Sequence, residues 1–159
     1  MAQYILPKLT ELVSSLLDVQ SYYRLIIVVG PIGAGKTPLL KALSREEDIP
    51  YLNLNLALSE RLLELSSRER PLRVRRLLEQ LIDEHPGNAT VLDNIELLFA
   101  PALKVNPLIL FQRLSRRRII VVAWGGAYDA ERDVLTYAEP GHPEYRRYER
   151  PDGEFITLP

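Results

Sequence analysis

The sequence has no cysteine, and only two histidines and one tryptophan among its 159 residues. Without cysteine the chain can form neither disulfides nor thiolate metal sites, so nothing in it requires an oxidising compartment. No apolar run approaches the roughly 20 residues that cross a bilayer, and residues 1–4 lack the basic start of a secretory signal. The net charge of −1 provides no overall field that would attract nucleic acid. We therefore expect a cytoplasmic protein that does not bind membranes.

A glycine-rich segment carries the clearest motif. Residues 30–37 read GPIGAGKT and match the phosphate-binding pattern G-x-x-x-x-G-K-[ST] in full. The apolar residues 24–29 before it predict a buried strand, and residues 36–45 predict a helix, which is the setting that the motif requires. We expect this loop to bind the phosphates of a nucleotide, through Gly30, Pro31, Ile32, Gly33, Ala34, Gly35, Lys36, Thr37 and Pro38.

Three side chains of the loop have predicted consequences for binding. Lys36 should reach the β- and γ-phosphates, and the hydroxyl of Thr37 should bind Mg²⁺. Pro38 departs from the usual pattern because proline has no N–H to offer the α-phosphate, although it fits the first turn of a helix. We expect ATP and Mg²⁺ as ligands, with an affinity that Pro38 keeps modest. The residues do not distinguish ATP from GTP.

A second motif lies at residues 91–99, which read VLDNIELLF. An apolar strand that ends in an acid beside the P-loop strand can hold Mg²⁺, so Asp93 is the predicted magnesium residue, through a water molecule. The alternative is that Asp93 caps a turn. Asn94 follows it, and an amide can orient water but cannot accept its proton. Glu96 could supply the missing base if the turn brings it inward.

Strand and helix patterns alternate along the chain. Strands are predicted over 24–29, 50–56, 90–93, 118–124 and 133–138, and helices over 6–19, 36–45, 58–66, 71–84 and 107–116. Residues 145–149 and 154–158 predict a closing hairpin. The alternation indicates an α/β fold, a three-layer P-loop NTPase sandwich with a mainly parallel central sheet. We predict one domain over 1–159, with an amphipathic helix in 1–20, a nucleotide-binding core over 24–124 and C-terminal strands or a hairpin over 133–159.

The two motifs together resemble those of the AAA+ class of P-loop ATPases over about residues 24–124. In that class a Glu follows the magnesium Asp and polarises the attacking water, whereas this chain has Asn94. A polar sensor residue commonly ends the later strand, whereas this chain has Trp124-Gly125-Gly126, and we expect Trp124 to pack. The helical lid domain of the class and its arginine have no counterpart. The resemblance therefore implies an AAA+-like core without a lid, and a slow ATPase or a nucleotide-gated binding protein.

Nearly the whole chain resembles the BrxF family, the small P-loop proteins of type 3 BREX phage-defence systems in bacteria. The resemblance lies in GPIGAGKTPLL, LNLNLALSERLL, VLDNIELLFAPALKVNPL, LSRRRIIVVAWGG and HPEYRRY. It implies antiviral defence beside a methyltransferase, a larger ATPase and a phosphatase-like protein.

Arginines outnumber lysines by 16 to 4. Arg117 or Arg118 could act as an arginine finger on the γ-phosphate of a neighbouring subunit. The alternative is that these side chains are hydrated charges near a helix end. A second cluster over residues 68–76, or the pair at 146–147, could contact a DNA backbone or form a solvated face.

Three functions stay open. The first is an ATP-binding homo-oligomer that acts as a nucleotide-controlled assembly switch, with weak or partner-dependent ATP hydrolysis, in BREX-type defence. The second is a small-molecule or nucleoside kinase, for which no acceptor motif is visible. The third is a nucleotide-binding scaffold that does not hydrolyse.

Overall fold

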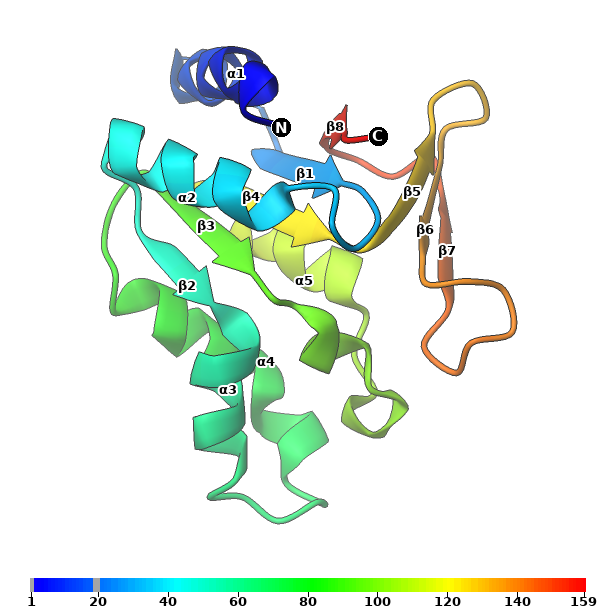
Figure 1. The fold of residues 1–159 in the computed structure, drawn as a ribbon. Helices are drawn as coiled ribbons and strands as arrows, with labels where there is room; N and C mark the ends of the chain where they lie inside the picture. Colours follow the sequence, from blue (N-terminus) through cyan, green and yellow to red (C-terminus); the bar gives the residue numbers. More distant parts are fainter. Residues whose placement is uncertain (1, 19–20) are drawn as a thin grey trace.

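Helices and strands alternate along the computed structural model, which describes residues 2–18 and 21–159 (Figure 1). The helices are α1 (Leu6–Asp18), α2 (Lys36–Glu47), α3 (Leu54–Leu62), α4 (Arg70–Asp83) and α5 (Pro107–Leu114), with short 3₁₀ helices η1 (Ala2–Ile5), η2 (Glu96–Phe99) and η3 (Pro101–Leu103). The strands are β1 (Leu25–Val29), β2 (Tyr51–Asn53), β3 (Ala89–Asp93), β4 (Ile119–Trp124), β5 (Gly126–Asp129), β6 (Val134–Tyr137), β7 (Arg146–Glu149) and β8 (Glu154–Thr157).

The main sheet has five strands in the order β2-β3-β4-β1-β8, and every neighbouring pair is parallel. Strands β1, β3 and β4 are buried along their whole length, because helices cover both faces of the sheet. Helices α1 and α2 lie on one face, and α3, α4 and α5 lie on the other (Figure 1). This arrangement confirms the predicted α/β fold with a mainly parallel central sheet.

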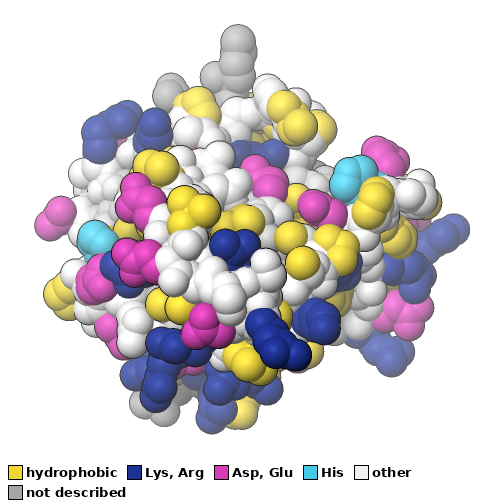
Figure 2. Space-filling model, turned by 90° about the horizontal axis from the view of Figure 1, so that it is seen from below, with side chains coloured by type: hydrophobic (Ala, Val, Ile, Leu, Met, Phe, Trp, Pro, Cys, Tyr) yellow, Lys and Arg dark blue, Asp and Glu magenta, His cyan; other side chains and the backbone are white. Residues whose placement is uncertain are grey.

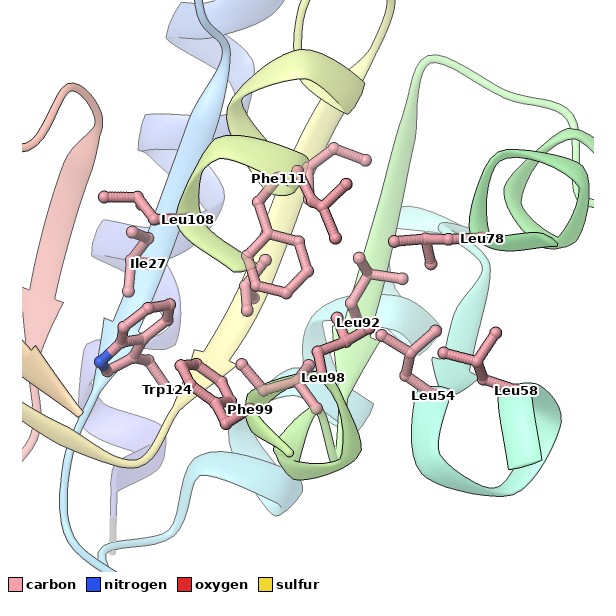
Figure 3. Close-up of a cluster of buried hydrophobic side chains, with 14 of the residues drawn as sticks. Ile27, Leu54, Leu58, Leu78, Leu92, Leu98, Phe99, Leu108, Phe111 and Trp124 are labelled. Atoms are coloured by element: carbon pink, nitrogen blue, oxygen red, sulfur yellow. The ribbon is translucent and has the colours of Figure 1, made fainter. Parts of the chain in front are cut away.

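Aromatic side chains fill the core where the sheet meets α5 and η2. Trp124, at the end of β4, is fully buried and makes edge contacts with Phe99 and Phe111 (Figure 3). Its indole Nε1 donates a hydrogen bond to the carbonyl of Thr136 at 2.9 Å. Phe99 also stacks on Tyr137 with their ring centroids 3.4 Å apart. Trp124 is therefore a packing residue, as expected, and it fastens the main sheet to β6.

A second sheet, of three antiparallel strands in the order β5-β6-β7, stands beside the carboxyl end of β4 (Figure 1). Strand β5 was not predicted, because Gly125-Gly126 indicates a turn. The close pairing of β5 with β6 requires glycine at the first position of β5: a Cβ on Gly126 would lie 1.9 Å from the carbonyl oxygen of Thr136. The second glycine is therefore a packing requirement of this sheet.

The predicted closing hairpin is wrong. Strand β7 pairs antiparallel with β6, whereas β8 pairs in parallel with β1 and forms an edge of the main sheet. The cause is the apolar burial of Ile156 and Leu158, which pack with the residues of the α1/α2 face. Alternation along a strand shows which residues face inward but not which strand is the partner.

The predicted strand over 50–56 is too long. Strand β2 ends at Asn53, whose side chain accepts the backbone N–H of Leu56 and caps α3. Leu54 and Leu58 then point into the core while Leu56 stays exposed, as helical rather than strand spacing requires. At the N-terminus, α1 covers 6–18 of the predicted helix, and residues 19 and 20 lie outside the described residues.

Within residues 2–18 and 21–159 there is no helical lid domain. None of the helices in this part of the chain combines the length and apolarity that a bilayer crossing requires.

Candidate functional site

The glycine-rich loop joins β1 to α2 at the carboxyl edge of the main sheet (Figure 1). The N–H of Gly30 donates to the carbonyl of Trp124 at 3.2 Å, which fixes the start of the loop to the end of β4. Gly35 has a φ of 97° and forms the N-cap of α2, a conformation that costs glycine little. The first N–H groups of α2 have no helical acceptor, so this loop presents backbone donors to an anion.

Lys36 lies across this loop. Its ammonium group donates hydrogen bonds to the carbonyls of Gly30 and Pro31, the second at 2.9 Å. Partial burial lowers the pKa of Lys36, while the negative charges of Asp93 and Glu96 act in the opposite direction. The ammonium group of Lys36 is thus held against the backbone of the glycine-rich loop. Pro38 occupies the first turn of α2, where it interrupts no helical hydrogen bond.

Asp93 ends β3, and its carboxylate is almost fully buried. Its Oδ2 accepts hydrogen bonds from Thr37 Oγ1 at 2.7 Å and from Tyr51 Oη at 2.5 Å, and its Oδ1 accepts the N–H of Asn94 at 2.9 Å. The two predicted magnesium residues, Thr37 and Asp93, are therefore in direct contact. A buried carboxylate with three donors is held in one orientation.

The route by which Asp93 reaches the loop differs from the expectation. Strand β3 does not lie beside the P-loop strand, since β4 lies between them. Asp93 reaches Thr37 because α2 packs across both β4 and β3, which carries the first turn of this helix over the end of β3 (Figure 1). The contact is made through a helix rather than between adjacent strands.

Tyr51 is a member of the site that sequence reasoning missed. It is the first residue of β2, paired in register with Val91 of β3, and it donates to the same oxygen of Asp93 as Thr37 does. Burial and this hydrogen bond both raise the pKa of Tyr51, burial more strongly. Tyrosine is common at the start of a strand, so the sequence around Tyr51 does not indicate a role at the site. The role becomes visible only from its hydrogen bond to Asp93.

The pair Thr37 and Asp93 fits Mg²⁺, which prefers oxygen ligands and keeps several waters. No group of three or more His, Cys, Asp or Glu side chains that could hold a metal occurs among the described residues. Further ligands of an ion here would therefore be phosphate oxygens and water, as at a nucleotide site.

Asn94 occupies a backbone conformation that explains its residue type. Its φ is 52°, in the left-handed region that asparagine tolerates better than most residues. Its carbonyl accepts the N–H of Asn55 at 2.8 Å, and the Asn55 side chain in turn accepts the N–H of Leu97 at 2.8 Å. Asn94 is therefore suited to this turn independently of any effect on chemistry.

A pocket of about 310 Å³ opens next to Lys36. Four segments line it: the P-loop, the end of β3 with the turn after it, the end of β4, and the second sheet with its β6–β7 connection. The residues with polar side chains in it are Lys36, Asp93, Asn94, Glu96, Tyr137, His142 and Glu144. Glu96 is exposed and is one of the residues that line this pocket, so its role as a base stays a prediction. Burial, followed by Glu96 and Glu144, raises the pKa of Tyr137 to about 12.

Sequence reasoning missed Tyr137, His142 and Glu144. They lie far along the chain from the loop and belong to no nucleotide motif. Their segment enters the site because β5 starts immediately after β4 and turns the second sheet toward the carboxyl edge.

Arg117 and Arg118 lie at the amino end of β4, whereas the P-loop lies at the carboxyl edge. Arg118 donates to the carbonyls of Ile82 and His85 at 3.3 and 3.1 Å and pairs with Asp83 at 3.4 Å. These contacts place Arg118 at the carboxyl end of α4, where a cation complements the helix dipole. A finger role for Arg117 or Arg118 stays a prediction about contacts between subunits.

Several of the other arginines line a groove between α4 and α5. A hollow of about 540 Å³ has Arg73, Arg75, Arg76 and Arg113 around it, with Leu72 and Ile109. On the face seen from below, Lys and Arg side chains are most numerous at the bottom of the view but also lie at its right and upper left, with acidic side chains among them (Figure 2). This groove is separate from the P-loop pocket.

No protein-family model matches the chain, and no curated protein matches it. Among solved structures it is similar to PCH-2 of C. elegans, with 17% identity and a TM-score of 0.48 over 98% of this chain and 42% of that one. It is also similar to a DNA replication initiation factor, with 15% identity and a TM-score of 0.47 over 99% of this chain and 46% of that one. The chain spans less than half the length of either structure. What it binds must therefore be inferred from its own residues.

Proposed function

We propose that this protein binds a nucleoside triphosphate, with ATP as the expected ligand, together with Mg²⁺. The observation that carries the proposal is the 2.7 Å contact between Thr37 and Asp93 beside Lys36 and the glycine-rich loop. Backbone donors and Lys36 would hold the phosphates, and Thr37 and Asp93 would hold Mg²⁺. When bound, the ion neutralises charge that develops on the phosphate oxygens.

We further propose that hydrolysis of ATP to ADP and phosphate is weak or depends on a partner. The oxygen of water would bond to the γ-phosphorus, the bond from that phosphorus to the ADP oxygen would break, and a base would take the proton from water. Asn94 cannot accept that proton, so Glu96, which lines the pocket, is the proposed base. A base in a non-standard position favours slow turnover.

The experiment compares nucleotide binding by the wild type, Lys36→Ala and the control Lys8→Ala. Lys8 is exposed on α1, away from the loop. Calorimetry with ATP and ADP, with and without Mg²⁺, should show binding that Mg²⁺ strengthens and that only Lys36→Ala abolishes. Equal binding by all three proteins would refute the proposal.

A small-molecule kinase and a non-hydrolysing scaffold are the alternatives. The 310 Å³ pocket beside Lys36 has room for an acceptor group, and this observation favours the kinase as an alternative function. Phosphate release without an added acceptor supports the ATPase, release that requires an acceptor supports the kinase, and binding with no release supports the scaffold.

The resemblance to the BrxF family supports a wider proposal: nucleotide controls self-association of the chain within a bacterial antiviral system. The proposed partners are a methyltransferase, a larger ATPase and a phosphatase-like protein. Light scattering with and without ATP and Mg²⁺ tests the self-association. Mixing Lys36→Ala with Arg117→Ala tests a finger in trans, since each variant should supply what the other lacks, and no recovery of phosphate release would count against it.

A second candidate function is contact with a DNA backbone through the α4/α5 groove, favoured by the four arginines around it. Such binding should weaken steeply as salt rises. Replacing Arg73 and Arg113 with alanine should reduce both the affinity and its salt dependence. Arg132→Ala, on the exposed end of the second sheet, is the control, and equal effects of both changes would argue against the groove.

A further inference from the structure

The segment between β6 and β7 brings a histidine to the phosphate pocket. His142 lines the same pocket as Lys36 and Asp93 although it lies far from both in sequence. Two backbone hydrogen bonds hold its turn: the N–H of His142 donates to Glu139 at 3.0 Å, and the N–H of Tyr145 donates to His142 at 3.0 Å. The exposed ring is thus carried on an ordered turn.

One hydrogen bond determines which nitrogen of this ring can donate. The backbone N–H of Glu144 donates to Nδ1 of His142 at 3.0 Å. Nδ1 is therefore the acceptor, and a neutral imidazole with an acceptor at Nδ1 carries its proton on Nε2. The turn leaves Nε2–H as the ring donor available to a ligand in the pocket.

The charged residues around the pocket explain why a bound phosphate would need the Nε2–H donor. The lining of the pocket includes three carboxylates, Asp93, Glu96 and Glu144, and one lysine, Lys36. A terminal phosphate in this pocket needs donors beyond the loop, because the carboxylates repel it. The end of β4 supplies no side-chain donor, because the Trp124 indole donates to the carbonyl of Thr136 and glycine follows.

We propose that His142 donates its Nε2–H to the terminal phosphate of the bound triphosphate, and that this contact distinguishes the triphosphate from the diphosphate. The inference rests on the proposed nucleotide binding. It assigns to the β6–β7 segment the sensing of the third phosphate, for which Gly125 and Gly126 directly after β4 have no side-chain donor.

The first test measures the tautomer of each histidine ring, and its response to nucleotide, by NMR. The chain has two histidines, and the other, His85, lies in the turn after α4 beside Arg118. NMR of ¹⁵N-histidine protein should show the Nε2–H tautomer for the signal that His142→Gln removes. A non-hydrolysable ATP analogue with Mg²⁺ should shift that signal, ADP with Mg²⁺ should shift it far less, and the His85 signal should not move. An Nδ1–H tautomer, or equal shifts with both nucleotides, overturns the proposal.

The second test measures affinity for the same analogue and for ADP. Loss of a hydrogen bond to a charged group should weaken binding of the analogue by about tenfold in His142→Ala, and change ADP binding less than twofold. His142→Gln, which keeps a donor, should recover part of the loss, and His85→Gln should match the wild type. Equal losses for both ligands, or no loss, overturn the role of His142 while nucleotide binding stands. Failure of the wild type to bind either nucleotide overturns both proposals.

Discussion

Removing the hydroxyl of Tyr51 should weaken the site in a way that depends on Mg²⁺. Tyr51 donates to Asp93 at 2.5 Å, on the oxygen that also accepts from Thr37. If Thr37 holds Mg²⁺ as proposed, its hydroxyl is needed for the ion, and Tyr51 and the N–H of Asn94 would be left to orient the carboxylate. Tyr51 would then be a positioning residue, and Tyr51→Phe deletes the hydroxyl while keeping the ring.

The expected magnitude follows from the partners that Asp93 retains. A hydrogen bond to a charged acceptor contributes about 1.5–3 kcal/mol, and the lower end applies because Thr37 and Asn94 still donate. A loss of about 1.5 kcal/mol should lower the Tm by roughly 3–6 °C for a chain of this size. Loss of a group that orients a metal ligand typically costs about 10–100-fold in metal affinity. We therefore expect ATP binding with Mg²⁺ to weaken about tenfold, and binding without Mg²⁺ to stay the same.

The pH dependence gives an independent check. The pKa of Tyr51 is raised in the folded protein above its ordinary value of about 10. A group whose folded pKa is raised contributes stability that is complete below the unfolded pKa and is lost as pH rises through the folded value. The difference in stability between the wild type and Tyr51→Phe should be constant between about pH 7 and 9 and shrink above about pH 10.

Tyr128→Phe is the matched control, because the Tyr128 hydroxyl also donates to an aspartate, Asp133, at 2.7 Å but on the second sheet. It should lower the Tm slightly and leave nucleotide binding unchanged. Unfolding by scanning calorimetry and titration of ATP at fixed Mg²⁺ measure both effects. If Tyr51→Phe bound ATP with Mg²⁺ as tightly as Tyr128→Phe does, the positioning role would be refuted.

Three other changes have distinct expected outcomes. Gly126→Ala should destabilise by about 3 kcal/mol or more in denaturant unfolding, since its Cβ would lie 1.9 Å from a backbone oxygen, whereas Gly125→Ala, whose Cβ would have no neighbour nearer than 3.8 Å, should cost far less. Arg118→Met should cost about 1–3 kcal/mol because it removes donors from the end of α4, and Arg117→Met should be nearly neutral. Asn94→Glu should lose about 1 kcal/mol from its left-handed backbone, yet raise phosphate release if the amide limits turnover; unchanged release would show that it does not.

The sequence was sufficient for those parts of the fold that local patterns determine. Strands β1, β3 and β4 are continuous apolar runs, which is typical of strands covered on both faces. The glycine-rich loop could be predicted because its glycines and its lysine form a continuous motif in the sequence. Thr37 and Asp93 were both predicted, and the structure brings them together.

Parts that depend on long-range pairing could not be predicted. Strand β8 is short, and its pairing with β1 depends on packing that is distant in sequence, of Ile156 on the α1/α2 face and of Phe155 on the other face. Asn53 capped a helix where alternation had indicated a strand. Tyr51 and His142 belong to the candidate site because of where β2 and the β6–β7 segment lie, and neither has a neighbour in sequence that marks it.

The way β4 ends links the candidate nucleotide site to the second sheet. Because the Trp124 side chain holds β6 through Thr136, and because Gly126 allows β5 to pair with β6 at close range, the second sheet is fixed to the carboxyl edge rather than free to swing. The β6–β7 connection that carries His142 and Glu144 is part of this sheet. A ligand that contacts His142 would therefore contact a segment whose sheet is anchored to the end of β4.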